Sequence, residues 1–309
     1  MKKQSPFKNK LEYALLRGAV GCLNALPHRA ALGLARGTAR LMFHVFRFKR
    51  ARTMRRLRSV FPERGERELR RIALESLSNM LCNAVEMCRA HLLSREWIDE
   101  HVPDIALYAA RLRELASRGR GVVIMVPHMG NWDMAAWALA RHGVNLFALA
   151  ARQRNPYVDG WMNRMRSTGM EVVLRGSAGT VRDIVSRLSA GQSFAMLPDL
   201  RVPQKDIQTP FLGGTANISH AGAAFALANG SPVVVACLRR KGSKHVFHHL
   251  ATIEPRPEEQ WPAAPSRQAA KRLEMERIMR ETMRLLDREI QATPGQWFWY
   301  NKRWLLQPV

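Results

Sequence analysis

The sequence predicts an α/β fold, in which a largely parallel β-sheet is flanked by helices, behind a basic amphipathic helical N-terminal segment. Two observations predict it. After residue 103, short runs of β-branched and other apolar residues alternate with stretches of helical period, and Gly or Pro separates them. Such alternation is typical of a parallel sheet with helices packed on it. Before that point, the apolar residues recur mainly at helical spacing.

The expected elements follow in chain order. Residues 11–60 are expected to form two helices with a turn near Pro27, and the charge-free stretch that begins at Ile207 is expected to start as a loop. Further helices are expected at 67–91, 111–118, 132–141, 157–167, 180–188, 219–228 and 267–292. Strands are expected at 121–126, 145–150, 171–174, 193–197, 233–238 and 246–253.

Positive charge is the unusual feature of the composition. Lys and Arg number 49 against 25 Asp and Glu, a formal net charge of +24, and residues 1–60 contain a single acid, Glu12. Because these basic residues are spaced through a Leu/Phe pattern, they favour an interfacial helix on anionic lipid over a polar nucleic-acid arm. We therefore predict a membrane-associating segment at 1–60 and an α/β domain at 61–309. The alternative for 1–60 is a soluble helical hairpin with a solvated basic face.

Several other classes of protein are disfavoured. The longest uncharged run of the N-terminal segment, residues 18–28, is well short of the ~20 residues that a transmembrane helix requires. No signal peptide is evident. The four cysteines have neither metal-binding spacing nor disulfide density, which favours a reducing compartment and no zinc. No nucleic-acid-binding motif is found, so a nucleic-acid partner is not expected.

The segment from His128 to Asp133 carries the clearest chemical signal. His128 follows a predicted buried strand, where ligands bind in open α/β sheets, and Asp133 lies at the expected start of a helix. Gly130 permits a tight turn that brings the two together. An Asp that bonds one imidazole nitrogen leaves the other free to take a proton. A helix-capping Asp and a merely packed His would give the same pattern.

No nucleophile of the protein accompanies this histidine. The sequence has no Gly-x-Ser-x-Gly elbow, no catalytic cysteine signature and no Walker or dinucleotide-binding loop. A general base without a protein nucleophile indicates that a substrate hydroxyl attacks an activated acyl group.

The His-x4-Asp segment resembles the hallmark of the glycerolipid acyltransferase superfamily. Within it, roughly residues 122–304 are most similar to the late acyltransferases of lipid A biosynthesis, the lauroyl and myristoyl transferases that act on Kdo-lipid IV-A. Beyond the hallmark, the similar stretches are 154–159 with 161–166, 197–199, 210–213, and 294–299 with 302–304.

The resemblance implies a glycerolipid-acyltransferase-like fold at 61–309. The implied reaction moves a fatty acyl chain from an acyl-carrier-protein thioester, or from acyl-CoA, to a hydroxyl of a Kdo-lipid IV-A type precursor. His128 would be the general base and Asp133 the acid that orients it, with no covalent intermediate, metal or cofactor. A backbone N–H at Gly130 or Asn131 is expected to stabilise the oxyanion.

The resemblance also implies residues that bind substrate. Arg164 and Arg166 correspond to a functional arginine, with Arg164 the better match, and Asp199 corresponds to a functional aspartate. A guanidinium can bind a phosphate through two parallel hydrogen bonds, and lipid A precursors carry phosphates. Arg154 is a weaker phosphate candidate, and Asn131 is also expected to bind substrate.

The expected location is the cytoplasmic face of the bacterial inner membrane, with the protein peripheral or anchored by its N-terminus to the anionic surface. Lipid A enzymes often have Glu where this chain has Asp133, so a second acceptor class stays open: another glycolipid or a lysophospholipid, such as a phosphatidylinositol mannoside. A third possibility is a basic membrane-binding protein without enzymatic activity.

Overall fold

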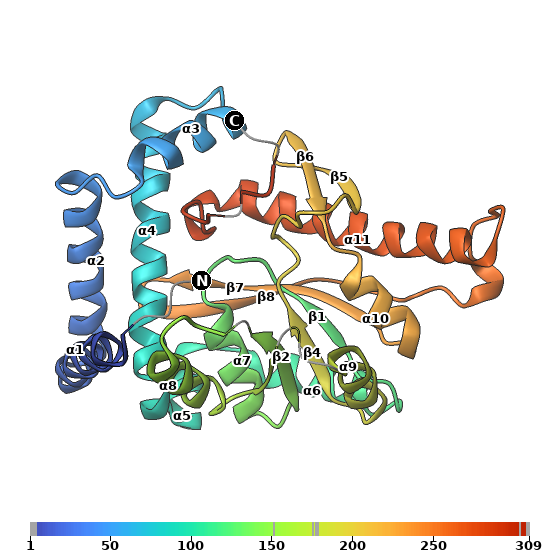
Figure 1. The fold of residues 1–309 in the computed structure, drawn as a ribbon, viewed down its shortest axis with the longest axis horizontal. Helices are drawn as coiled ribbons and strands as arrows, with labels where there is room; N and C mark the ends of the chain where they lie inside the picture. The colour runs from blue at the N-terminus through green and yellow to red at the C-terminus, as the bar shows by residue number, and fades with distance from the viewer. Residues whose placement is uncertain (1–4, 151, 175, 177–178, 303, 307–309) are drawn as a thin grey trace.

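A mostly parallel six-stranded sheet with the order β3-β2-β4-β1-β7-β8 forms the centre of the fold, as expected (Figure 1). The computed structural model describes residues 5–150, 152–174, 176, 179–302 and 304–306. β8 is antiparallel to β7, and the other neighbouring strands are parallel. The strands of this sheet are β1 (Val123–Met125), β2 (Leu146–Ala150), β3 (Glu171–Leu174), β4 (Ser193–Met196), β7 (Val233–Lys241) and β8 (Lys244–Ile253).

Helices cover both faces of the sheet because both faces are apolar. Val123 and Met125 of β1 belong to one hydrophobic cluster, and Ile124 between them belongs to another. The first cluster includes residues of α9 (Thr180–Ser189), α10 (Ala221–Asn229) and α11 (Arg267–Ala292). The second includes residues of α5 (Arg95–His101), α6 (Ile105–Ala116) and α7 (Trp132–Arg141). A strand buried on both sides reads as a continuous apolar run, which is how β1 is recognised in the sequence.

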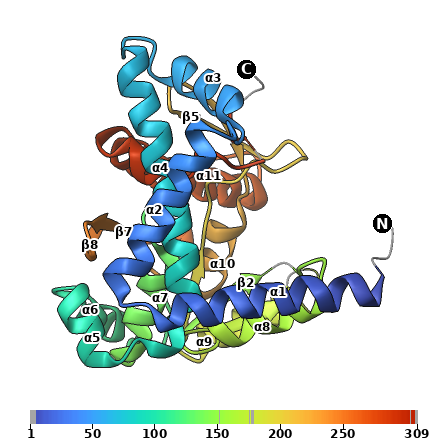
Figure 2. The same ribbon diagram turned by 90° about the vertical axis from the view of Figure 1, so that its left-hand side faces the viewer.

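The N-terminal part is a group of helices: α1 (Pro6–Ala25), α2 (His28–His44), α3 (Arg50–Val60) and α4 (Glu66–Cys88). α2 lies beside α4, and α1 lies beside α8 (Pro156–Arg166) (Figures 1 and 2). Phe43 of α2 and Leu57 of α3 share the hydrophobic cluster of β1. The division of the chain at residue 60 stays a prediction.

Three local expectations were wrong. Residues 11–60 form three helices, since Arg47 and Lys49 adopt φ values of 48° and 49°, which a right-handed helix does not accommodate. α5 was not expected. The expected loop after residue 206 is an antiparallel hairpin, β5 (Ile207–Phe211) and β6 (Gly214–Ile218). Its Pro210 suggested a loop, but a two-stranded sheet consists of edge strands, where proline is tolerated.

Most of the remaining expectations agree with the structure to within a few residues, but the helix expected at 111–118 is α6, which begins earlier, at Ile105. The predicted bounds of α7, β3 and α11 are those observed. Three short 3-10 helices were not expected: η1 (Ala90–Leu92), η2 (Glu258–Gln260) and η3 (Pro294–Gln296).

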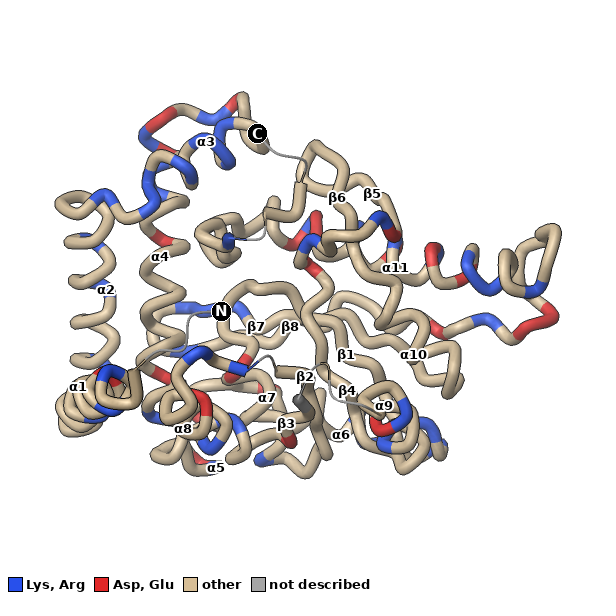
Figure 3. Tube along the Cα trace, viewed as in Figure 1, with Lys and Arg blue, Asp and Glu red and all other residues tan. Residues whose placement is uncertain are grey.

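The charges are distributed unevenly over these elements. On α11, basic and acidic residues alternate and form ion pairs, such as Arg277 with Glu274 and Arg284 with Glu281. On α3, Arg predominates (Figure 3). The positive excess therefore lies on the N-terminal helices more than on α11. Among the described residues, no helix combines the length and the hydropathy needed to cross a membrane.

Candidate active site

His128 and Asp199 meet at the carboxyl edge of the sheet. His128 follows β1 and Asp199 follows β4, and these strands are parallel neighbours. The Nδ1 atom of His128 lies 2.7 Å from Oδ1 of Asp199, and the backbone N–H of His128 donates to Oδ2 at 2.7 Å. Trp297 Nε1 donates to the same Oδ2 at 2.8 Å. One carboxylate thus fixes both the backbone and the ring of the histidine.

The electrostatics keep Asp199 ionised. Burial alone would raise its pKa, but the charge and hydrogen bonds of His128 and the indole N–H of Trp297 outweigh burial and lower the pKa. The ionised Asp199 accepts a hydrogen bond from the Nδ1–H group of His128. Nε2 then carries the lone pair, and no described residue is within hydrogen-bonding distance of it. Nε2 is therefore the ring nitrogen that is left without a partner among the described residues, as a general base requires.

Asp133 occupies a different position from the one expected. It lies in the first turn of α7, and its Oδ1 atom is 3.5 Å from Nε of Arg166. Asp133 is 7 % exposed, and burial raises its pKa although Arg166 and His128 oppose that rise. The expectation that Asp133 bonds the His128 ring is therefore corrected, because Asp199 holds Nδ1. Spacing along one loop favoured Asp133, whereas the pairing that forms joins residues 71 positions apart.

The three candidate arginines are separated by the geometry of α8. Arg166 faces Asp133, whereas Arg164 is exposed. Residues two apart on a helix differ by about 200°, so the two arginines cannot face the same site. Arg154 is exposed in the segment that precedes α8. The structure thus brings Arg166 to the His128 site, and leaves Arg154 and Arg164 on the surface around it.

The expected oxyanion donors are already bonded within the protein. The backbone N–H of Gly130 donates to the carbonyl of Gln296 at 2.9 Å, and that of Asn131 donates to the carbonyl of Leu238 at 3.0 Å. The Asn131 side chain is 1 % exposed and caps α7 by accepting from the backbone N–H of Met134. In this structure neither amide is free to donate to an oxyanion, which disfavours the expected oxyanion role. The role of Asn131 in binding substrate stays a prediction.

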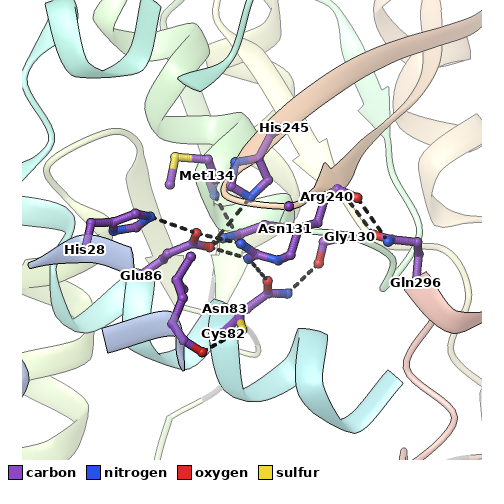
Figure 4. A network of polar contacts seen from close by, with 12 residues as sticks. His28, Cys82, Asn83, Glu86, Gly130, Asn131, Met134, Arg240, His245 and Gln296 are labelled. Atoms are coloured by element: carbon purple, nitrogen blue, oxygen red, sulfur yellow. Dashed lines mark hydrogen bonds and ion pairs between the residues drawn. The ribbon is translucent and has the colours of Figure 1, made fainter. Parts of the chain in front are cut away.

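A buried polar network contacts the turn at Gly130 and Asn131 (Figure 4). Glu86 of α4, 0 % exposed, accepts a hydrogen bond from Asn131 Nδ2 at 2.6 Å and one from Arg240 Nη1 at 2.7 Å. Arg240 also donates to Oδ1 of Asn83 at 2.9 Å. Burial would raise the pKa of Glu86, but the Arg240 charge and hydrogen bond lower it far below the usual range. The network is therefore an ion pair with amide partners, fixed against the turn that follows β1.

Two histidines border the Glu86 carboxylate without hydrogen bonding to it. His28 Nε2 lies 3.8 Å and His245 Nε2 3.6 Å from its oxygens. Burial lowers the pKa of His28 to about 4 and also lowers that of His245, although Glu86 opposes both shifts. Both rings are therefore neutral near pH 7, and Arg240 alone balances the carboxylate.

The close approach of Gly130 to β7 requires a residue without a side chain. Its φ is +57°, and a Cβ built there would overlap the backbone carbonyl of Leu238. Gln296 joins the same contact, since its Oε1 accepts from the backbone N–H of Arg240 at 3.0 Å. The turn after β1 is thus held by β7 and η3 as well as by α4.

Two residues of this site, Glu86 and Arg240, were not singled out from the sequence, whereas Gln296 and Trp297 lie in the similar stretch 294–299 but were given no role in the site. For Glu86 a signal was present. The buried stripe of α4 begins with Leu69 and Ile72 and continues at the same spacing with polar residues, which are Ser76, Asn79, Asn83 and Glu86. Buried polar groups require partners, so a polar stripe on a buried helix face indicates a structural network.

The described residues contain no group of three His, Cys, Asp or Glu side chains placed to hold a metal ion. Comparison with known protein families gives one match. The family model described as bacterial lipid A biosynthesis acyltransferase matches residues 1–306 of the chain. No curated protein sequence matches the chain. The matched region contains the helix that carries Glu86, as well as the strands that His128 and Asp199 follow.

Proposed function

We propose a reaction for this chain from one premise: it belongs to the bacterial lipid A biosynthesis acyltransferases and is therefore an acyltransferase. In the proposed reaction, it moves an acyl chain from an acyl-carrier-protein thioester to a hydroxyl of Kdo-lipid IV-A, with His128 as general base. Family membership overturns the interpretation of the chain as a membrane-binding protein without enzymatic activity. The observation that carries the proposed role of His128 is its orientation, with Nδ1 on Asp199 and Nε2 facing away from it.

The proposed reaction needs one proton acceptor and no nucleophile of the protein. Nε2 of His128 removes the proton from the acceptor hydroxyl, and the oxygen attacks the carbonyl carbon of the thioester. The tetrahedral intermediate collapses to an ester as the carbon–sulfur bond breaks, and the imidazolium returns its proton to the thiolate. Asp199 stabilises the imidazolium between these steps.

Arginine is the best available group for the negative charge of substrate and intermediate. Arg166 lies beside Asp133, and the charge of His128 lowers the pKa of the same Asp133. The Arg166 guanidinium is therefore proposed to lie close to where the oxyanion would form. This replaces the backbone amides of Gly130 and Asn131 in that role. The exposed Arg154 and Arg164 are proposed to bind acceptor phosphates as the substrate enters.

The net charge of +24 supports an acidic carrier protein as donor, because complementary charge raises the rate of encounter. The experiment that tests donor and acceptor combines the purified chain in detergent with acyl-carrier thioesters or acyl-CoA. Kdo-lipid IV-A, a lysophospholipid and a phosphatidylinositol mannoside serve as acceptors. We expect mass spectrometry to find one added acyl group on Kdo-lipid IV-A with the carrier donor. Acylation of another acceptor alone would overturn the proposed substrate.

We also propose that the protein is peripheral on the anionic cytoplasmic face of the inner membrane and binds it through α1. Phe7, Leu11 and Leu15 recur at four-residue spacing on one side of that helix and are 76 %, 50 % and 67 % exposed. Exposed apolar residues on a basic helix are typical of helices that lie in the interface of an anionic bilayer. The family match extends over this helix as well.

The double variant Leu11→Ser/Leu15→Ser is expected to bind vesicles that contain phosphatidylglycerol at least tenfold more weakly, as measured by cosedimentation. Replacing two leucines removes about 3 kcal/mol or more of the free energy gained when their side chains move from water into the bilayer interface. Leu107→Ser is the matched control, because Leu107 is 70 % exposed on α6, away from α1. Equal losses in the two variants would contradict the role of α1.

A further inference from the structure

A cleft of about 360 Å³ lies outside the catalytic turn, between α2, α4 and the β7–β8 turn. Arg36 and Arg40 of α2 and Arg71 of α4 line it, and Arg240, Asn79 and Gln296 also contribute to its wall. A hydrogen bond joins two walls of the cleft: Arg36 Nη2 donates to the carbonyl of Gly242 at 2.8 Å and so fixes α2 to the β7–β8 turn.

The positive charge of this cleft is incompletely neutralised. Arg240 is balanced by Glu86, but Arg36, Arg40 and Arg71 have only Glu75 among the lining residues. The Glu75 carboxylate lies against Gly295, where a Cβ would overlap it, and no ion pair within 4.0 Å joins Glu75 to the three arginines. Arg71 has a long contact of 3.8 Å with Glu68. Three arginines around a cleft with one carboxylate leave a positive charge there, which favours an anionic ligand.

The buried side of the cleft carries hydrogen-bonding groups suited to the same ligand. Arg240 is 8 % exposed, and its Nε atom is buried without a hydrogen-bond partner among the described residues. A buried donor without a partner requires an explanation, and a bound anion would supply one here. Arginine forks match the geometry of phosphate oxygens.

We propose that this cleft is a second anion site of the protein, which binds a phosphate group through Arg36, Arg40 and Arg71. The cleft is larger than a bare phosphate, so the phosphate is carried by an organic group, either a soluble phosphate ester or the headgroup of an anionic lipid. His128 and Asp199 do not line this cleft, and the site does not depend on the proposed reaction.

The cleft is connected to the catalytic turn through its wall. Gln296, which lines the cleft, accepts the backbone N–H of Gly130 through its carbonyl and the backbone N–H of Arg240 through its side chain. Arg240 reaches Asn131 through Glu86. A phosphate bound in the cleft therefore restrains both partners of the turn that positions His128.

The test uses isothermal titration of the full chain with sn-glycerol 3-phosphate, and cosedimentation with phosphatidylglycerol vesicles, at matched ionic strength. Arg36→Gln/Arg40→Gln is expected to weaken binding at least tenfold. The control Arg111→Gln/Arg182→Gln removes the same charge from exposed positions of α6 and α9 and is expected to change binding less than twofold.

The two arms identify the source of the phosphate. Loss in the soluble arm supports a soluble phosphate ester, whereas loss in the vesicle arm alone supports a lipid headgroup. No saturable binding in either arm, or equal loss in the control variant, would overturn the site. Ligand is also expected to slow amide hydrogen exchange of residues 128–135 in the parent chain and not in Arg36→Gln/Arg40→Gln. Unchanged exchange would overturn the connection to the turn.

Discussion

His128→Ala is expected to lower kcat for acyl transfer by roughly 10²–10⁴-fold, the usual contribution of a general base. The fold should survive, because the backbone N–H of residue 128 and the Trp297 indole still donate to the buried Asp199 carboxylate. KM for the thioester donor should change little, since the imidazole acts on the proton of the acceptor. Initial rates with the carrier thioester and the preferred acceptor measure both constants, and thermal unfolding checks the fold.

A paired comparison separates the two carboxylates. Asp199→Asn places an amide against Nδ1 of His128, and an amide N–H there favours the tautomer with its proton on Nε2, which removes the base. Its kcat should fall nearly as far as that of His128→Ala. Asp133→Asn should retain more activity, since Asp133 contacts Arg166 and not the ring. Near-parental turnover in His128→Ala, or a greater loss in Asp133→Asn than in Asp199→Asn, would contradict these roles.

The fold could be predicted largely because its signals are local. β1 is a continuous apolar run, and α11 has a helical period with opposite charges three and four residues apart, so residue order alone predicts both. The turn at Arg47 and Lys49 and the hairpin around Pro210 could not be placed in this way. Arg47, Lys49 and Leu212 all adopt positive φ values, which non-glycine residues rarely do, so their residue types do not predict these turns.

The site was predicted only in part, for a related reason. His128 is identifiable because it ends a buried strand, but its carboxylate partner is set by which strand lies next to β1 in the sheet. The sequence does not give that order. Asp199 was noted as a functional position, yet its contact with His128 follows only from the pairing of β1 with β4. Arg166 and Arg164 differ only in the direction that α8 gives them.

The polar stripe of α4 connects the fold to the reaction. Ser76 donates to the carbonyl of Trp297, Asn79 Nδ2 to that of Gly295 at 3.0 Å, and Asn83 Nδ2 to that of Gly130. One helix therefore fixes both the turn that follows β1 and the C-terminal segment whose Trp297 bonds Asp199. A site held on rigid elements keeps its groups within the small tolerances that proton transfer demands. This predicts that the interior of α4 controls activity without contacting substrate.

Glu86→Gln is expected to reduce the free energy of unfolding by about 3–5 kcal/mol, the usual cost when one partner of a buried ion pair is removed. The Arg240 guanidinium would keep its charge at 8 % exposure with no carboxylate to balance it. Urea unfolding followed by tryptophan fluorescence measures the change. Activity should also fall, through Asn131 and the turn, and the variant should show faster hydrogen exchange at residues 128–135.

Two further variants separate the buried charge from a general effect of substituting α4. Glu66→Gln removes a glutamate at the start of the same helix, where its pair with Arg58 is exposed, and unfolding should be unchanged within error. Glu86→Met/Arg240→Met removes both charges and should be more stable than Glu86→Gln, because an apolar pair leaves no unbalanced ion. That double variant should still transfer acyl chains poorly, since methionine cannot bond Asn131. If it instead restores turnover, Glu86 contributes stability alone and does not position the His128 turn.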